Sequence, residues 1–118
     1  MMKKSFNKIQ RLIIDAAAEK KAFDILVLDL RKRSSIADSF VICSANSKTQ
    51  VQAIADAVLE KTSGAKYKAI AMEGYSSGSW VVLDLVDVVV HVFLKEARKH
   101  YDLERLWGDV PAIEAVGL

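Results

Sequence analysis

Two carboxylates that follow a Gly-Ser dipeptide come nearest to a catalytic pattern in this sequence. Asp84 and Asp87 stand shortly after Gly78-Ser79. Nucleotidyltransferases use a Gly-Ser dipeptide with two carboxylates, placed two residues apart on one strand, to hold magnesium and a nucleoside triphosphate. Here the carboxylates are three residues apart and flank an expected turn. A metal-dependent nucleotidyltransferase that uses Asp84 and Asp87 is therefore an alternative function rather than the favoured one.

Other catalytic patterns are missing from the sequence. It has no Gly-x-Gly-x-x-Gly and no phosphate-binding loop with a lysine. His91 and His100 do not stand at a recognised metal-ligand spacing from Cys43, and no serine is marked out as a nucleophile. We therefore expect a protein that is not an enzyme and that uses no cofactor and no metal. His91 is expected to pack against the indole of Trp80.

The stretch from Gly78 to Leu94 consists of two apolar runs separated by a short acidic break, which predicts a β-hairpin. With Leu85 and Val86 as a two-residue loop, antiparallel partners are counted outward from the turn. The predicted pairs are Asp84 with Asp87, Val82 with Val89, and Trp80 with His91. These six side chains share one side of the hairpin, because side chains alternate along a strand.

The two sides of this hairpin differ in polarity. One side is wholly aliphatic and is predicted to be core; it carries Val81, Leu83, Val88, Val90, Val92 and Leu94. The other side mixes an indole, an imidazole, two carboxylates, two valines and Phe93. It is too apolar for a plain solvated face and too polar for a sealed core. We expect this mixed side to contact another macromolecule.

Helical periodicity appears in two segments before the hairpin. Apolar residues at spacings of three and four predict a helix from Phe6 to Lys20, with Ser5 as its N-cap. A second helix is opened by Ser47, which forms a capping box with Gln50. Gly64 is expected to end that helix as a left-handed C-cap residue.

Strand patterns fill the segments between these helices. Runs from Phe23 to Leu30, from Asp38 to Ala45 and from Tyr67 to Glu73 are apolar or alternating. The helix after the second strand allows a parallel pair, and the last three strands are expected to form an antiparallel meander. The predicted fold class is α/β: a mixed five-stranded sheet with helices packed mainly on one face, in a single domain over residues 1–118.

Composition and charge narrow the class of protein. With 52% hydrophobic and 27% charged residues, the 118-residue chain resembles a soluble globular domain, and no apolar run is long enough to span a membrane. The basic start is not followed by an uninterrupted apolar segment, so no signal peptide is expected. The single Cys43 is expected to be a buried small hydrophobe in a reducing compartment. These features predict a cytoplasmic protein.

The charge is unevenly distributed along the chain. Residues 1–33 carry nine basic and four acidic side chains, whereas residues 84–118 carry four basic and seven acidic ones. Such a chain is not a general polyanion binder. An acidic C-terminal third suits a basic protein partner better than a phosphate backbone.

The C-terminal segment departs from the pattern of the rest. Residues 96–107 can start a helix but have no clean long face, and they contain Tyr101, Leu103, Leu106 and Trp107. Gly108 and Pro111 are expected to stop any regular structure there. Two interpretations remain open: this segment folds back to cap the sheet, or it helps to build the same contact face as Trp80.

Four segments together resemble one known family. They are Ser34-Ser35-Ile36-Ala37-Asp38, the stretch from Glu73-Gly74 to Asp84, the run from Asp87 to Phe93, and the stretch from Tyr101 to Asp109. In this order they are similar to the ribosomal silencing factor family, also called Iojap-like, over residues 6–111. Relatives often carry glycine where Val86 stands and a second aromatic where His100 stands. A β-branched residue resists the positive φ of a tight primed turn.

The resemblance implies a fold and a function. The fold would be related to the nucleotidyltransferases without their active site. The function would be to bind the large ribosomal subunit through ribosomal protein L-fourteen on the intersubunit face. A body held there blocks joining of the small subunit, so that translation falls when nutrients are short. Members of the family are also expected to form homodimers when free.

The favoured function is therefore a non-enzymatic translational repressor. Trp80 and Tyr101 are predicted to be its aromatic anchors. The remaining predicted contacts are apolar, from Val82, Val89, His91, Leu103, Leu106 and Trp107, or acidic, from Asp84, Asp87, Asp102 and Glu104. No membrane contact and no sequence-specific nucleic-acid binding are expected. The other rival is a dimeric structural module in which the Trp80 side is only a homodimer seam.

Overall fold

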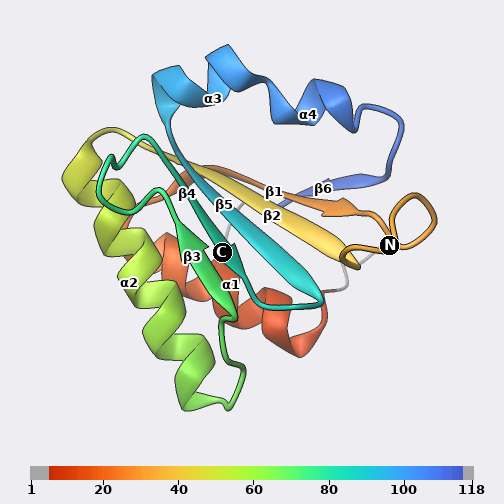
Figure 1. Ribbon diagram of the computed structural model, residues 1–118, viewed down its shortest axis with the longest axis horizontal. Helices are drawn as coiled ribbons and strands as arrows, with labels where there is room; N and C mark the ends of the chain where they lie inside the picture. Colours follow the sequence, from red (N-terminus) through yellow and green to blue (C-terminus); the bar gives the residue numbers. More distant parts are fainter. Residues whose placement is uncertain (1–5, 116–118) are drawn as a thin grey trace.

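A computed structural model describes residues 6–115 of the chain (Figure 1). Four helices are present in it: α1 (Lys8–Glu19), α2 (Lys48–Gly64), α3 (Lys95–Tyr101) and α4 (Leu103–Leu106). The strands are β1 (Phe23–Asp29), β2 (Ser39–Ala45), β3 (Ala71–Glu73), β4 (Trp80–Asp84), β5 (Val88–Leu94) and β6 (Ala112–Glu114). The predicted mixed α/β fold is confirmed.

The strands form one sheet in the order β3-β4-β5-β2-β1-β6. Strands β3, β4 and β5 form the predicted antiparallel meander. The parallel pair joins β2 to β5, and the chain reaches β5 through α2, β3 and β4. All other neighbours are antiparallel. Parallel pairing of β2 with β5 places the hairpin in the middle of the sheet, between β3 and β2.

The sheet has six strands within residues 6–115, so the predicted count of five was wrong. The additional strand, β6, follows Pro111, where regular structure was expected to stop, and it pairs with β1 at the edge. The carbonyl of Pro111 accepts the Asp29 amide at 2.9 Å, so this pairing does not require a proline N–H. A three-residue strand is too short to show an alternating pattern in the sequence.

Helices α1 and α2 cover one face of the sheet (Figure 1). Helix α1 begins later than predicted, because Asn7 is its N-cap and forms a capping box with Gln10. The predicted cap, Ser5, lies outside the described residues. Ser47 caps α2 as predicted and accepts the Gln50 amide at 3.1 Å. The Gln50 side chain, however, bonds the amide of Asn46 rather than that of Ser47.

The end of α2 differs from the prediction. Gly64 is the last helical residue and does not have positive φ; the left-handed residue is Lys66, at φ 71°. The third strand is also shorter than predicted, because residues 67–70 precede β3 as irregular chain. Neither change alters the position of the central hairpin.

The hairpin register was predicted incorrectly. Asp84 pairs with Val89, Val82 with His91 and Trp80 with Phe93, so the two turn residues are Val86 and Asp87. Val86 adopts φ 75° despite its branched side chain. The carboxylate of Asp84 accepts the Val86 amide at 2.9 Å, and the Asp87 amide donates to the Leu85 carbonyl at 3.0 Å. These two bonds hold a turn that valine alone disfavours.

The predicted faces survive the register change, because moving the turn by one residue shifts every partner by two. The aliphatic side forms the main core with α1 and α2, as predicted: Val81, Leu83, Val88, Val90 and Val92 are all buried, and Leu94 packs against them. Within the described residues, no helix is long and apolar enough to cross a membrane.

Cys43 lies in this core and is fully buried, as predicted. Burial raises the pKa of its thiol to about 12, because a thiolate would be deprived of water there. We expect iodoacetamide at pH 8 to label the folded protein on the order of a thousandfold or more slowly than the unfolded chain. Mass spectrometry with and without urea measures both rates. Rapid labelling of the folded protein would contradict the described burial.

Candidate functional site

The candidate site is the face of the sheet opposite α1 and α2. The tail (residues 95–115) folds back so that α3 and α4 lie over part of this face (Figure 1). Three hairpin side chains on this face are buried: Val89, His91 and Phe93. The interpretation that the tail caps the sheet is confirmed, and Tyr101 of the tail lies beside Trp80 on the same face. That the two form a contact face for a partner stays a prediction.

An aromatic stack joins the hairpin to the tail. Trp80 stacks on Phe93 with ring centroids 4.9 Å apart, and Tyr101 packs on Trp80 with centroids 4.7 Å apart. Phe93 is fully buried, Trp80 is partly exposed and Tyr101 is 54% exposed. The two predicted anchors are thus in contact with each other. They form the solvent-facing end of a stack whose inner member, Phe93, is buried in the core.

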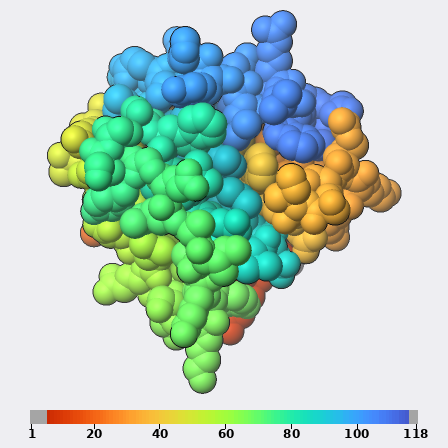
Figure 2. Space-filling model, viewed as in Figure 1, coloured from red at the N-terminus to blue at the C-terminus, as the bar shows by residue number. Residues whose placement is uncertain are grey.

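Other predicted contact residues on the hairpin and the tail are also exposed or partly exposed. We define the aromatic face as the exposed and partly exposed side chains Trp80, Val82, Tyr101, Leu103, Leu106 and Trp107. Leu106 is 73% exposed, which is unusual for a large aliphatic side chain. In Figure 2 the tail forms the upper part of this view, with the loop between β1 and β2 at its right and residues of the hairpin below. The structure does not bring Val89 and His91 to the surface.

Beneath the aromatic face, Trp80 Nε1 donates a hydrogen bond to His91 Nδ1 at 3.1 Å. The predicted packing of His91 against the indole is confirmed, although the ring contact is looser than this bond, with centroids 6.0 Å apart. Since Nδ1 accepts a hydrogen bond, the neutral ring carries its proton on Nε2, which is buried and has no hydrogen-bond partner within residues 6–115. Burial lowers the pKa of His91 to about 4.

The depressed pKa of His91 predicts a pH-dependent stability. Between about pH 4 and 6.5 the unfolded chain binds a proton that the folded chain rejects, so stability is full above pH 6.5 and falls as the pH falls. The free energy of unfolding should be about 2 kcal/mol lower at pH 5 than at pH 7.5. Urea unfolding at the two pH values, followed by circular dichroism, measures this difference.

The two histidines provide matched variants for this measurement. His91→Gln keeps an acceptor for Trp80 but does not titrate, so most of the pH dependence should disappear. His100 is exposed on α3, and His100→Gln should leave the pH dependence as it is in the wild type. Equal pH dependence in wild type and His91→Gln would refute the assignment.

The predicted acidic contacts have different settings. Asp84 is partly exposed and holds the turn, Asp87 is exposed within it, and Asp102 joins α3 to α4 with φ 50°. Glu104 bonds to Arg98 of α3. The expected approach of Asp84 to Asp87 across the hairpin is wrong, because Asp84 faces Val89. Within the described part of the chain no three acidic, histidine or cysteine side chains are grouped to hold a metal.

Sequence reasoning missed two residues of this site. Phe40 lies 4.5 Å from His91 and 5.8 Å from Trp107, measured between ring centroids, and so joins β2 to the tail. Arg98 reaches from α3 to β1 and β2. Phe40 becomes recognisable only when β2 is known to run parallel to β5, and nothing in the sequence marks Arg98 among the neighbouring charges.

Comparisons with known proteins agree with the motifs in the sequence. A family model described as "Ribosomal silencing factor during starvation" matches residues 3–118. The chain is 46% identical to ribosomal silencing factor RsfS of Bacillus subtilis, over 94% of this chain and 92% of that protein. It is 42% identical to RsfS of Halalkalibacterium halodurans, over 97% of both chains.

A solved structure supports the fold. The crystal structure of a Chromobacterium violaceum protein superposes with a TM-score of 0.85 at 38% identity, covering 97% of this chain and 95% of that one. Together with the family model and the two relatives, this superposition shows that this chain belongs to the ribosomal silencing factor family.

Proposed function

We propose that this chain is a translational repressor that binds the large ribosomal subunit through ribosomal protein L-fourteen and blocks the joining of the small subunit. The single observation that carries the proposal is the aromatic face. A tyrosine from the tail packs at 4.7 Å on a tryptophan of the sheet, and both remain accessible to solvent. Membership of the ribosomal silencing factor family supports the class of partner.

The composition of this face suits a protein partner. Aromatic side chains are enriched at the energetic centre of protein interfaces, and here they are held in place before binding by the buried Phe93. Asp84 is partly exposed and Asp87 and Asp102 are exposed, so their carboxylates are free to meet basic groups of a ribosomal protein. A specific interface of this kind buries roughly 1,600 Å² in total.

Repression on this proposal is steric. The domain measures 36 × 33 × 29 Å along its principal axes. Subunit contacts require opposing surfaces to approach within van der Waals distance, so a body of this size bound on the intersubunit face would hold the subunits apart. No bond is made or broken, and the affinity for the large subunit sets the extent of repression.

Sedimentation with purified subunits tests the proposal. The chain should co-sediment with large subunits and not with small ones, and it should bind isolated L-fourteen in a pull-down. Added before mixing, it should reduce the yield of joined ribosomes in a sucrose gradient. Failure to bind large subunits would refute the proposal, whereas binding without an effect on joining would refute its steric part.

We also propose that the free chain forms a homodimer through the same face. The observation in favour is the exposure of Tyr101 and Leu106, two large side chains that a second copy would remove from water. Light scattering of wild type and Trp80→Ala over a range of concentrations measures the mass. A dimer that persists in Trp80→Ala would place the seam elsewhere.

A further inference from the structure

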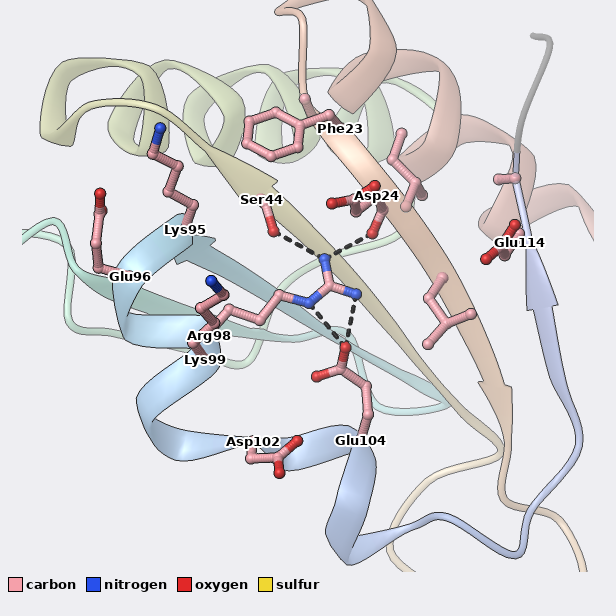
Figure 3. A pocket seen from close by; sticks show the side chains of 14 residues that line it. Phe23, Asp24, Ser44, Lys95, Glu96, Arg98, Lys99, Asp102, Glu104 and Glu114 are labelled. Carbon is pink, nitrogen blue, oxygen red and sulfur yellow. Dashed lines mark hydrogen bonds and ion pairs between the residues drawn. The ribbon is translucent and has the colours of Figure 1, made fainter.

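The side chain of Arg98 lines a cavity, where it forms hydrogen bonds that join the tail to the sheet. The cavity has a volume of about 740 Å³ and is lined by α3 and by residues of β1 and β2, among others (Figure 3). Nη1 of Arg98 donates to the carbonyl oxygen of Asp24 at 2.6 Å and to Ser44 Oγ at 2.8 Å. Nε and Nη2 both contact one carboxylate oxygen of Glu104, each at 2.9 Å.

The two acceptors on the sheet are a backbone carbonyl at an irregularity of β1 and a buried hydroxyl of β2. Strand β1 shifts register between Phe23 and Leu26, and Asp24 adopts φ 51° there. Such a bulge takes a carbonyl group out of the strand ladder and redirects it. Ser44 is 2% exposed, so its hydroxyl needs a partner inside the protein. Arg98, whose side chain is only 12% exposed, bonds both groups.

The segment that Arg98 holds contains few buried side chains. Helix α3 has seven residues and α4 has four, and neither contains a buried residue. Helices this short are not stable without tertiary contacts. They are joined through Asp102 in the left-handed conformation. The side chains of Leu103 and Trp107 pack only partly against the small core beneath them.

Glu104 forms an ion pair with Arg98 of the same chain. Its carboxylate is about one-third exposed and contacts two nitrogens of Arg98. This bond spans the corner between α3 and α4 and sets the position of α4 relative to α3. The carboxylate was predicted to meet a basic group on the ribosome, and its geometry favours an indirect role.

We propose that Arg98 is a positioning residue of the aromatic face: it clamps α3 and α4 to β1 and β2, and Glu104 acts on binding through it. The inference rests on the proposed function for its effect on binding. The clamp itself is a property of the free chain. Arg98 sets where Tyr101 and Leu106 lie without contacting the partner.

The first test uses the free protein. Amide hydrogen exchange over residues 95–107 should be about tenfold faster in Arg98→Ala than in the wild type, while exchange in β4 and β5 stays unchanged. Lys99→Ala is the matched control, since it removes an exposed cation from the same helix. Unchanged exchange over residues 95–107 in Arg98→Ala would overturn the clamp, whether or not the chain binds ribosomes.

The second test is a double-mutant cycle on binding to large subunits. Arg98→Ala and Glu104→Ala should each weaken binding about tenfold, and the double variant should be no more than about threefold weaker than either. Glu104→Gln retains an acceptor for Arg98 and should bind within about threefold of the wild type. Losses that multiply in the double variant, or Glu104→Gln as weak as Glu104→Ala, would show direct contact by Glu104 and overturn the inference.

The salt dependence of binding provides an independent readout. A positioning role predicts the same slope of affinity against salt concentration in wild type and Glu104→Gln, whereas loss of a direct ion pair would reduce it. Failure of the wild type to bind large subunits would refute the proposed function and leave the exchange test standing. Normal binding by Arg98→Ala, with a wild type that binds, would refute this inference alone.

Discussion

Replacing Trp80 by alanine is expected to weaken binding to the large ribosomal subunit by about thirty- to a thousandfold. The loss of one buried aromatic anchor at an interface costs on the order of 2 to 4 kcal/mol. Tyr101 packs against Trp80 in the aromatic face, so removal of the indole takes away the support of that neighbour as well. Co-sedimentation over a titration of large subunits measures the change in affinity.

Two controls separate binding from folding in this experiment. The indole also stacks on Phe93 and bonds His91, so the urea midpoint of Trp80→Ala must be measured beside its affinity. Ile70→Ala removes an exposed apolar side chain outside the aromatic face and should bind as the wild type does. Unchanged co-sedimentation of a folded Trp80→Ala would remove the anchor role.

Replacing Phe93 by alanine should have its main effect on stability. Phe93 is fully buried between the sheet and the tail, and it carries the stack on which Trp80 rests. Truncating a buried phenylalanine costs about 3 to 5 kcal/mol, which combines lost transfer free energy and the cavity left behind. A domain stabilised by about 5 to 15 kcal/mol would lose a large part of that margin. Urea unfolding followed by circular dichroism measures the loss.

Phe93→Leu serves as the milder variant, because it keeps an apolar side chain at this site and should cost considerably less than alanine. Trp80→Ala should therefore be impaired chiefly in binding and Phe93→Ala chiefly in stability, although the two rings are in contact. A stability loss below about 1 kcal/mol for Phe93→Ala would mean that the tail does not seal this site.

The assignment of side chains to faces was available from the sequence. Alternation along a strand depends only on parity, so Trp80 and Val82 were placed on the correct side although their partners were wrong by two positions. The helical faces and the Ser47 cap were likewise predicted, because each depends on interactions within a few residues of chain.

Features that depend on distant segments were not predicted. The turn was misplaced because Val86 adopts a backbone conformation that its own side chain disfavours, held by the Asp84 carboxylate. Strand β6 exists because β1 offers it an edge, and its three residues carry no pattern of their own. In both cases tertiary contacts outweigh the local conformational preference of the residues.

The sequence by itself therefore determined which side chains could share a surface, because the periods of strands and helices are local properties of the chain. Only the tertiary structure decided which of them reach solvent. His91 is buried in the folded chain whereas Trp80 stays partly exposed, and Arg98 holds the tail through groups on β1 and β2. Those contacts join residues more than fifty positions apart, and no local pattern encodes such a contact.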